Sequence, residues 1–304
     1  MLQDQKFIGV ISALSGAILF SLKPVLIKLI YAIEDISSLE LLVLRMLISL
    51  PFYIFILFYF QKVAVIKSHI QSFWKAMLLL GFIGFYLASY LDFSGLQYIP
   101  AGLERAILFL NPTMVVIISA LYFKKEISRL QAIAIVLSYI GIVIAFLSNT
   151  QFDTHSNIPL GSMLVFSSAF FYALFLIGSE IYLLKIGTVA FTCYTMILAF
   201  AFIMIHYLFT NSLYPLSQFQ AKTYWIAFMM SIISTIIPSF LFSEGIKHIG
   251  ASNGSIIGGI GPISTIILAH FILGESIGSW QIIGTFLVIL GVVIISYSAK
   301  KTSA

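Results

Sequence analysis

GLQYIPAGLERAILFLNPTMVVIISALYFKKEIS, the stretch 95–128, returns in the second half of the chain as GIKHIGASNGSIIGGIGPISTIILAHFILGESI at 245–277. Residues 98–148 align with residues 248–298 without a gap, and the most distinctive matches are Pro112 with Pro262, Gln131 with Gln281, and Gly141 with Gly291. The beginnings of the two halves match more weakly, as Gly9 with Gly161, Ser15 with Ser167, Ala17 with Ala169, and Leu22 with Leu174. An internal repeat governs the whole architecture, so we predict two related halves.

The composition of the chain requires lipid as its solvent. Hydrophobic residues make up 61% of the sequence, charged residues only 9%, and the mean hydropathy is +1.09. In a water-soluble domain, about a quarter of all residues are charged. The net charge of +5 is spread between apolar runs, whereas a nucleic-acid-binding module needs a concentrated basic face. We therefore predict an all-α polytopic membrane protein that binds no nucleic acid.

The apolar runs are each long enough to cross a hydrocarbon core of about 30 Å, which takes about 20 helical residues. Breaks rich in polar or turn-forming residues separate them. We predict ten transmembrane helices, at 7–30, 37–60, 73–91, 100–123, 128–147, 158–182, 188–209, 223–245, 250–273 and 278–298. Residues 1–148 form the first five-helix repeat and residues 158–298 the second, followed by a cytoplasmic tail at 299–304.

The basic residues predict the orientation, because short loops rich in Lys and Arg stay in the cytoplasm. With the N-terminus inside, eleven of the 16 basic residues fall in cytoplasmic segments, and only Lys28 and Lys222 lie near the outer face. An even number of helices then places both termini in the cytoplasm. Since each half has an odd number, the second half enters the membrane in the opposite sense. Such inverted repeats are typical of alternating-access transporters.

Among the charged residues within the predicted helices, four candidates lie at depth on the outer half of the bilayer: Lys23, Arg45, Glu104 and Arg105. Ionisable groups are costly inside a membrane and usually face a cavity or a partner. We interpret them as an outer gate or as a binding patch for an ionic headgroup, in which opposite charges pair across the first, second and fourth helices. The alternative is structural: Lys23 and Arg45 snorkel to the interface, while Glu104 and Arg105 begin a helix.

The prolines at the middle of the fourth and ninth predicted helices each remove a backbone hydrogen bond. Asn111 precedes Pro112, and the Gly258–Gly261 run precedes Pro262. These residues are interpreted as a paired pivot beside a binding site, or else as ordinary kinks. Tyr90 and Tyr172 are further candidates for lining a pocket, although most aromatic residues of such a chain pack or face lipid.

Other classes of protein lack their sequence signatures here. The five histidines show no zinc-type spacing, and no P-loop for ATP is present. The single Cys193 cannot form an internal disulfide. We therefore expect no catalytic residues, no enzyme activity, no metal and no cofactor. A lipid-headgroup flippase and a non-transporting membrane scaffold remain as alternatives to a transporter.

The two quoted stretches resemble the EamA-type repeat of the drug/metabolite transporter superfamily. The second ends in the Gly-Glu that commonly closes this helix, here Gly274-Glu275. In the first half Lys124-Lys125-Glu126 stands there, so the glycine is missing and the acid is displaced by one residue. The ten-helix count and Arg45 also fit the resemblance, which covers nearly the whole chain.

The resemblance implies a basket in which the first, third, fourth, sixth, eighth and ninth helices surround a central cavity. It further implies secondary active transport, with export of a small metabolite, such as an amino acid or a drug-like solute, by alternating access. The expected location is the bacterial inner (plasma) membrane, as a multi-pass protein surrounded by membrane lipid. A homodimer is left open.

Overall fold

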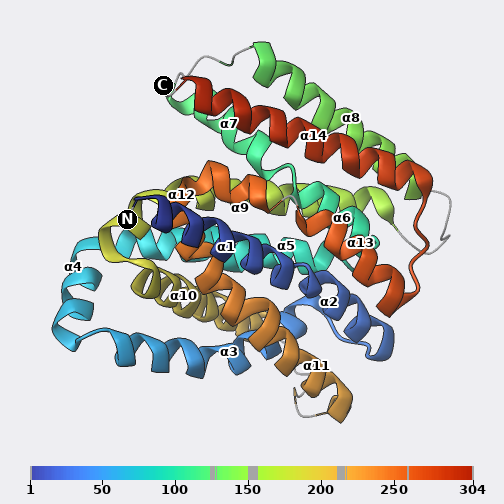
Figure 1. Cartoon of the computed structure of the whole chain (residues 1–304). Helices are drawn as coiled ribbons and strands as arrows, with labels where there is room; N and C mark the ends of the chain where they lie inside the picture. Colours follow the sequence, from blue (N-terminus) through green and yellow to red (C-terminus); the bar gives the residue numbers. More distant parts are fainter. Residues whose placement is uncertain are drawn as a thin grey trace.

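A computed structural model describes residues 2–123, 127, 129–149, 157–210, 216, 218–258 and 260–302. Every regular element in this part of the chain is helical (Figure 1). Lys124-Lys125-Glu126, Gly259 and the end of the predicted tail at 303–304 lie outside the described residues. The chain is therefore an all-helical protein over its described length.

The helices follow one another with short connections. In chain order they are α1 (Leu2–Phe20), α2 (Leu22–Ile33), α3 (Ser38–Phe60), α4 (Val63–Leu80), η1 (Gly81–Leu87), α5 (Ala88–Gly95), α6 (Ala101–Leu108), α7 (Asn111–Phe123), α8 (Arg129–Asn149), α9 (Ile158–Ile186), α10 (Thr188–Phe209), α11 (Ala221–Ser231), η2 (Ile232–Ile236), α12 (Ile237–Ile257), α13 (Ile260–Leu273) and α14 (Ser279–Thr302). Both η segments are π-helices.

Seven of these helical stretches are long and apolar enough to cross a membrane. They are Phe7–Ile33, Ser38–Phe60, Gln71–Gly95, Ala101–Ile118, Ile158–Ile186, Thr188–Phe209 and Ala221–Gly250. Three shorter apolar helices, Ala132–Ala145, Ile260–Leu273 and Ser279–Gly291, fall where the sequence predicts the remaining spans. The chain is thus a multi-pass membrane protein.

The distribution of side chains is inverted relative to a water-soluble protein. Large apolar residues cover the outside; Phe209 of α10, for example, is 84% exposed. In contrast, charged side chains such as Arg45, Asp92 and Glu104 are buried. A lipid solvent explains this pattern, since apolar side chains lose nothing by facing hydrocarbon and polar groups must find partners inside the protein.

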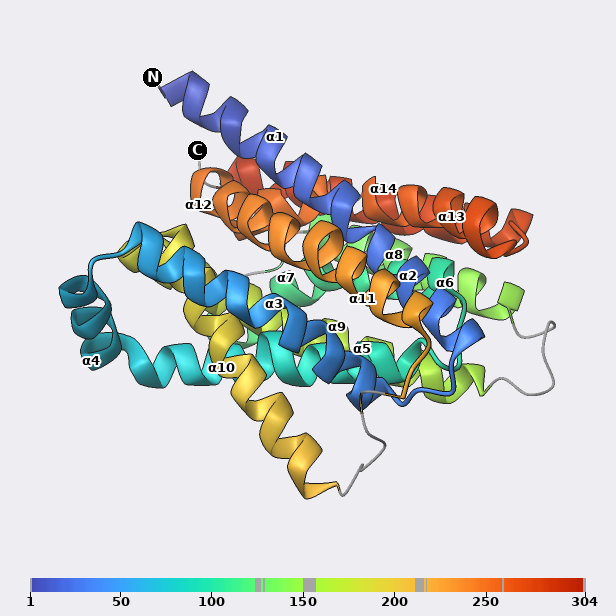
Figure 2. The same cartoon turned by 90° about the horizontal axis from the view of Figure 1, so that it is seen from below.

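The helices pack in pairs that respect the two halves of the sequence. α1 packs along α12, and α5 packs along α9; α3 packs along α10, and α8 along α14 (Figures 1 and 2). The pair α1–α12 joins the first predicted helix of the first half to the third of the second half. The pair α5–α9 joins the third predicted helix of the first half to the first of the second half, so these two pairs are equivalent by the repeat. The other two pairs each join corresponding helices of the two halves.

Glycines form the closest points of the two exchanged pairs. A Cβ atom on Gly245 would lie 2.7 Å from the Cβ atom of Ala13, and one on Gly9 would lie 2.7 Å from the Cβ atom of His248. Correspondingly, a Cβ atom on Gly95 would lie 2.9 Å from the carbonyl oxygen of Gly161. Such contacts let two helix backbones approach closely.

The crossing of α8 and α14 also depends on glycine. A Cβ atom on Gly284 would lie 2.5 Å from the carbonyl oxygen of Gly141, and a Cβ atom on Gly141 would lie 2.5 Å from the carbonyl oxygen of Gly284. The two corresponding helices therefore meet backbone to backbone.

We predict that Gly95→Ala and Gly245→Ala each lower the melting temperature of the purified protein in detergent. The added methyl group forces the helices apart, which corresponds to an overpacking cost of about 1–3 kcal/mol. Gly278→Ala is the control, because the nearest atom to its Cβ lies 3.9 Å away. Equal melting temperatures for all three variants and the unaltered chain would contradict the crossings described here.

Candidate functional site

A chamber of about 140 Å³ lies between the two halves of the chain. The first four predicted helices of each half contribute lining residues, and the fifth helix of each half contributes none of those that line it. The predicted site residues that line it are Lys23, Arg45, Arg105, Asn111, Pro112, Tyr172, Gly258 and Pro262. The chamber is surrounded by irregular helical segments.

The first interruption separates α1 from α2 at Ser21. Pro24 follows three residues later and has no N–H group to donate to the carbonyl of Phe20. This carbonyl instead accepts a hydrogen bond from Nη2 of Arg105 on α6. The proline therefore creates an open acceptor inside the protein, and the arginine satisfies it.

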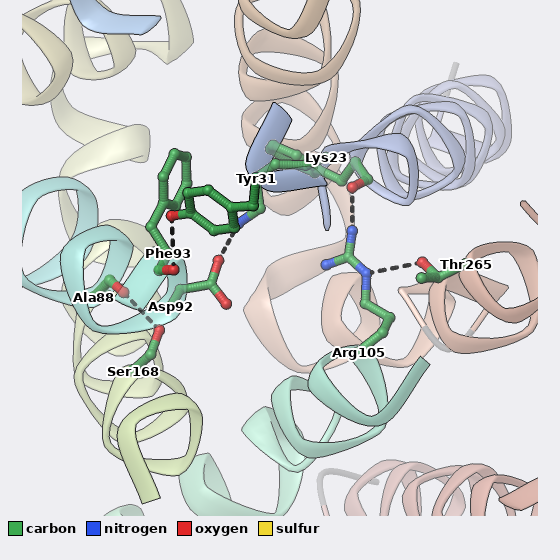
Figure 3. A network of polar contacts seen from close by, with 9 residues as sticks. Lys23, Tyr31, Ala88, Asp92, Phe93, Arg105, Ser168 and Thr265 are labelled. Atoms are coloured by element: carbon green, nitrogen blue, oxygen red, sulfur yellow. Dashed lines mark hydrogen bonds and ion pairs between the residues drawn. The ribbon is translucent and has the colours of Figure 1, made fainter. Parts of the chain in front are cut away.

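Arg105 joins three parts of the chain around this interruption (Figure 3). Its Nε atom donates to Oγ1 of Thr265 on α13 at 3.3 Å, and the Thr265 hydroxyl donates to the carbonyl of Ser21 at 3.1 Å. The Ser21 hydroxyl in turn lies 3.3 Å from the carbonyl of Gly261. The fourth and ninth predicted helices are thus connected to the break in the first.

Two further interruptions lie at the paired prolines. The fourth predicted helix is broken between α6 and α7, directly before Asn111 and Pro112. The ninth is broken between α12 and α13, and α13 begins at Ile260, two residues before Pro262. Oδ1 of Asn111 is buried and has no hydrogen-bond partner. Both prolines are buried beside the chamber, so each half contributes one broken helix to its wall.

The π-helical segments are a third kind of irregularity, which the sequence analysis did not anticipate. η1 interrupts the third predicted helix and η2 the eighth, its counterpart in the other half. Gly84 and Phe85 of η1 and Ser234 and Thr235 of η2 line the chamber. π-Bulges often occur at functional sites, and here they occur at matching places in the two halves.

Lys23 forms an ion pair with Asp92 of α5 at the chamber wall. Its Nζ atom lies 2.6 Å from Oδ2 of Asp92, and the side chains are 14% and 2% exposed (Figure 3). Lys23 therefore does not snorkel to the interface. Asp92 is not among the predicted site residues, because the predicted third helix ends at Leu91, whereas α5 continues to Gly95. The apolar Phe93 after the acid is the feature of the sequence that indicates a longer helix.

Glu104 lies behind this pair and does not line the chamber. Its side chain is fully buried in α6, within hydrogen-bonding reach of the Asp92 carboxyl group and within electrostatic reach of Arg105 and Lys23, but it forms no ion pair with either cation in the described part of the chain. The expected gathering of opposite charges occurs, but its ion pair joins the first helix to the third. The expectation of a pair involving Glu104 is corrected accordingly.

Arg45 of α3 is 4% exposed and lines the chamber. Its Cζ atom lies 4.9 Å from the centre of the Phe93 ring, and Nε and Nη2 have no hydrogen-bond partner. The structure thus excludes snorkelling for Arg45 as well. It leaves a buried guanidinium whose donors are incompletely used.

The two candidate tyrosines lie in different places. Tyr172 of α9 lines the chamber. Tyr90 does not, because it lies about 100° around α5 from the chamber-lining Ser89, with its ring 4.9 Å from that of His206. Nearby, the Ser168 hydroxyl donates to the carbonyl of Ala88 at 2.7 Å and joins α9 to α5 (Figure 3).

Gly274 and Glu275 follow the end of α13, which is the end of the predicted ninth helix. Gly274 has a φ of 71°, a left-handed conformation that glycine adopts without strain. Oε1 of Glu275 accepts a hydrogen bond from the backbone N–H of Ala101 at 3.1 Å. The acid therefore caps the beginning of α6, so the loop after α13 in the second half of the chain is bound to the first half. Within the described part of the chain no cluster of three His, Cys, Asp or Glu residues suits a metal ion.

Comparison with solved structures supports this architecture. One crystal structure of a protein superposes on this chain with a TM-score of 0.69 at 15% sequence identity. The superposition covers 97% of this chain and 99% of the other chain. At this identity the likeness concerns the fold alone.

The sequence is also similar to bacterial proteins named as transporters. It is 28% identical over 300 residues to the uncharacterized transporter YcbK of Bacillus subtilis, covering 97% of this chain and 94% of that protein. It is 27% identical to the uncharacterized transporter YyaM of the same organism, covering 78% and 80%. The model of the EamA-like transporter family matches residues 7–147 and again residues 159–297. With almost its whole length matched in two segments around a shared chamber, the chain belongs to the EamA-like transporter family.

Proposed function

We propose that this protein is a secondary active transporter that exports a small metabolite across the inner (plasma) membrane by alternating access. Its ten transmembrane helices form two inverted five-helix repeats with both termini in the cytoplasm. The observation that carries the proposal is the chamber, which lies where broken or π-helical segments of both halves meet. Irregular helices at the interface of two repeats are characteristic of transporter substrate sites.

The packing supports the inverted arrangement. Gly9 aligns with Gly161, and Gly95 and Gly245 begin the two repeated stretches. The segments around Gly9 of α1 and Gly245 of α12 cross closely. The equivalent crossing in the other half is formed by Gly161 of α9 and Gly95 of α5. One crossing can loosen while its counterpart tightens, which is the exchange that alternating access requires.

The position of the termini supports the proposed orientation. The beginning of α1, the end of α14 and the connection from α3 to α4 lie at the same end of the helical bundle (Figures 1 and 2). Lys62 lies in this connection, and Lys67 follows in the second turn of α4. The positive-inside tendency assigns that end to the cytoplasm.

In this mechanism the Lys23–Asp92 pair holds the first helix against the third on the outer half of the chamber. The interruptions beside Pro24, Pro112 and Pro262 let the two parts of each broken helix tilt separately. The solute enters from the cytoplasm, and rearrangement of the ion pair accompanies its release outside. A lipid-headgroup flippase and a non-transporting scaffold are the competing functions, which the first experiment below distinguishes.

We predict saturable counterflow of at least one small metabolite in liposomes that contain the purified protein. Vesicles are loaded with a metabolite extract, and exchange against isotope-labelled extract is followed by mass spectrometry. A comparison of metabolites released by cells with and without the protein selects the solutes to test. Labelled-lipid movement without solute exchange would favour the flippase, and neither activity would favour the scaffold.

We predict that Asp92→Asn lowers both the melting temperature and the counterflow rate, because it leaves Lys23 buried without its partner. Breaking a buried ion pair in this way costs about 3–5 kcal/mol. The double variant Lys23→Gln/Asp92→Asn removes both charges and is expected to regain much of the melting temperature but not the transport. Transport by the double variant at the unaltered rate would show that the pair is structural only.

Lys247→Gln is the matched control for this experiment. Lys247 forms an ion pair with Glu244 at 3.2 Å, but both side chains are about one third exposed. Exposed pairs contribute only about 0–1 kcal/mol, so melting temperature and counterflow should change little.

We predict that single cysteines near both ends of the chain react from the cytoplasmic side. Residue substitutions Gln3→Cys and Ser303→Cys are introduced separately after Cys193→Ser, and labelling by a membrane-impermeant maleimide is compared in intact cells and inverted vesicles. Asp35→Cys in the loop after α2 is the control for the outer face. Labelling of the two ends from opposite faces is incompatible with the inverted repeat.

A further inference from the structure

The chamber wall carries more positive than negative charge. Three cationic side chains line it, Lys23, Arg45 and Arg105, against one acid, Asp92. Lys23 is paired with Asp92, and Arg105 donates to a backbone carbonyl and to a threonine hydroxyl. Arg45 is the cation of this wall whose Nε and Nη2 atoms have no hydrogen-bond acceptor.

The surroundings of Arg45 hold its backbone firmly in place. Its carbonyl oxygen accepts hydrogen bonds from the hydroxyls of Ser49 at 2.8 Å and Ser231 at 3.0 Å, which joins α3 to α11. The Phe93 ring lies beside its guanidinium. Asp92 is within electrostatic reach, but Lys23 occupies Oδ2 and Arg45 makes no hydrogen bond to Oδ1. The charge is therefore positioned but not neutralised by a direct contact.

A buried charge without such a contact is unfavourable until a partner arrives. The planar guanidinium offers its donors in a fixed fork that matches the two oxygens of a carboxylate. Thr235 lines the same chamber four residues after Ser231, and its buried hydroxyl has no hydrogen-bond partner. One helical turn beyond the contact between Ser231 and Arg45, the chamber wall thus presents a second polar group with unused hydrogen-bonding capacity.

The size and the remaining lining restrict the rest of the solute. A cavity of about 150 Å³ holds a benzene molecule, whereas drug-sized ligands occupy about 300–1,000 Å³; the chamber of about 140 Å³ suits the smaller class. Phe20, Phe85, Phe109 and Phe242 supply an apolar part of the wall. A short apolar body fits there.

We infer that Arg45 binds the carboxylate of the transported solute and that this solute is a small organic anion with a short apolar body. The inference rests on the proposed transport function and specifies the chemical class of its substrate. A cationic drug-like compound would meet an excess of positive charge in the same chamber, and its amine would leave Arg45 unpaired.

Binding is measured on the purified full-length protein in detergent, because isobutyric acid crosses lipid unaided and would obscure a flux measurement. The probes are isobutyrate, the neutral isobutyramide, the cationic isobutylamine and the zwitterion valine. Affinity is obtained from the dependence of the melting temperature on ligand concentration. Isobutyrate should raise the melting temperature. The amide and the amine should bind at least about tenfold more weakly, since the amide lacks the anionic, bidentate acceptor and the protonated amine offers Arg45 no acceptor at all.

Arg45→Gln should abolish the preference for isobutyrate over isobutyramide. Arg129→Gln is the matched control, because Arg129 is exposed at the beginning of α8, and it should leave the preference unchanged. If Arg45→Gln does not fold, the unaltered protein is treated with butane-2,3-dione, a small arginine reagent. Isobutyrate should then slow modification of Arg45, located by peptide mass spectrometry, without slowing modification of Arg129.

The inference is overturned if isobutyrate has no effect, if the amide or the amine binds as well, or if valine alone binds. It is equally overturned if Arg45→Gln keeps the preference or if Arg45 is not protected. Should counterflow of another solute nevertheless be saturable, the transport proposal stands and only the substrate class is wrong. Absence of counterflow together with carboxylate binding would instead remove transport and leave Arg45 as an anion site.

Discussion

The structure depends on the requirement that every backbone N–H and C=O group inside a bilayer finds a partner within the protein. A continuous helix meets this requirement alone, but a broken helix does not. Where Pro24 leaves the Phe20 carbonyl without its helical donor, Arg105 donates to it, and Thr265 donates to the carbonyl of Ser21. Because Thr265 belongs to the other half of the sequence, the two repeats complete one another's backbone.

This requirement explains why polar residues gather around the chamber. Each interruption exposes groups that need hydrogen bonds, and the side chains that provide them also place charge there. The Lys23–Asp92 pair closes one side, while Arg105 connects α6 to both the first and the ninth predicted helices. Arg45, by contrast, is held through its backbone and its ring contact and keeps donors available. The same wall therefore contains groups that support the fold and a group suited to bind a solute.

Glycine and π-helices serve the complementary purpose of bringing backbones together and disturbing their regularity. Gly245 against Ala13, and Gly95 against Gly161, let paired helices cross without intervening side chains. η1 and η2 disturb the third and eighth predicted helices at the level of the chamber. A membrane provides little hydrophobic driving force between helices, so close backbone packing of this kind stabilises their association.

Much of this molecule was predictable from its residues, and particular positions show where prediction ended. Pro112 and Pro262 indicated breaks because proline lacks a donor, and a break precedes each of them. Asp92 lies outside the predicted third helix, because the apolar run of that helix ends one residue earlier, at Leu91. The π-segments gave no periodic signal, since five to seven residues are too few to reveal a changed helical period. Tyr90 was misplaced because side-chain direction depends on the rotation of α5.

The amino-acid sequence by itself determined the lipid environment, the helical class and the two related halves, because composition, apolar length and repeated residues are properties of the chain alone. It also indicated that Lys23, Arg45, Glu104 and Arg105 lie at membrane depth. Only the tertiary structure decided which partners these charges meet: Lys23 forms an ion pair with Asp92, 69 positions away, and Arg105 donates a hydrogen bond to Thr265, 160 positions away. Such partners depend on how helices rotate and cross, and those angles arise from packing between segments distant in sequence.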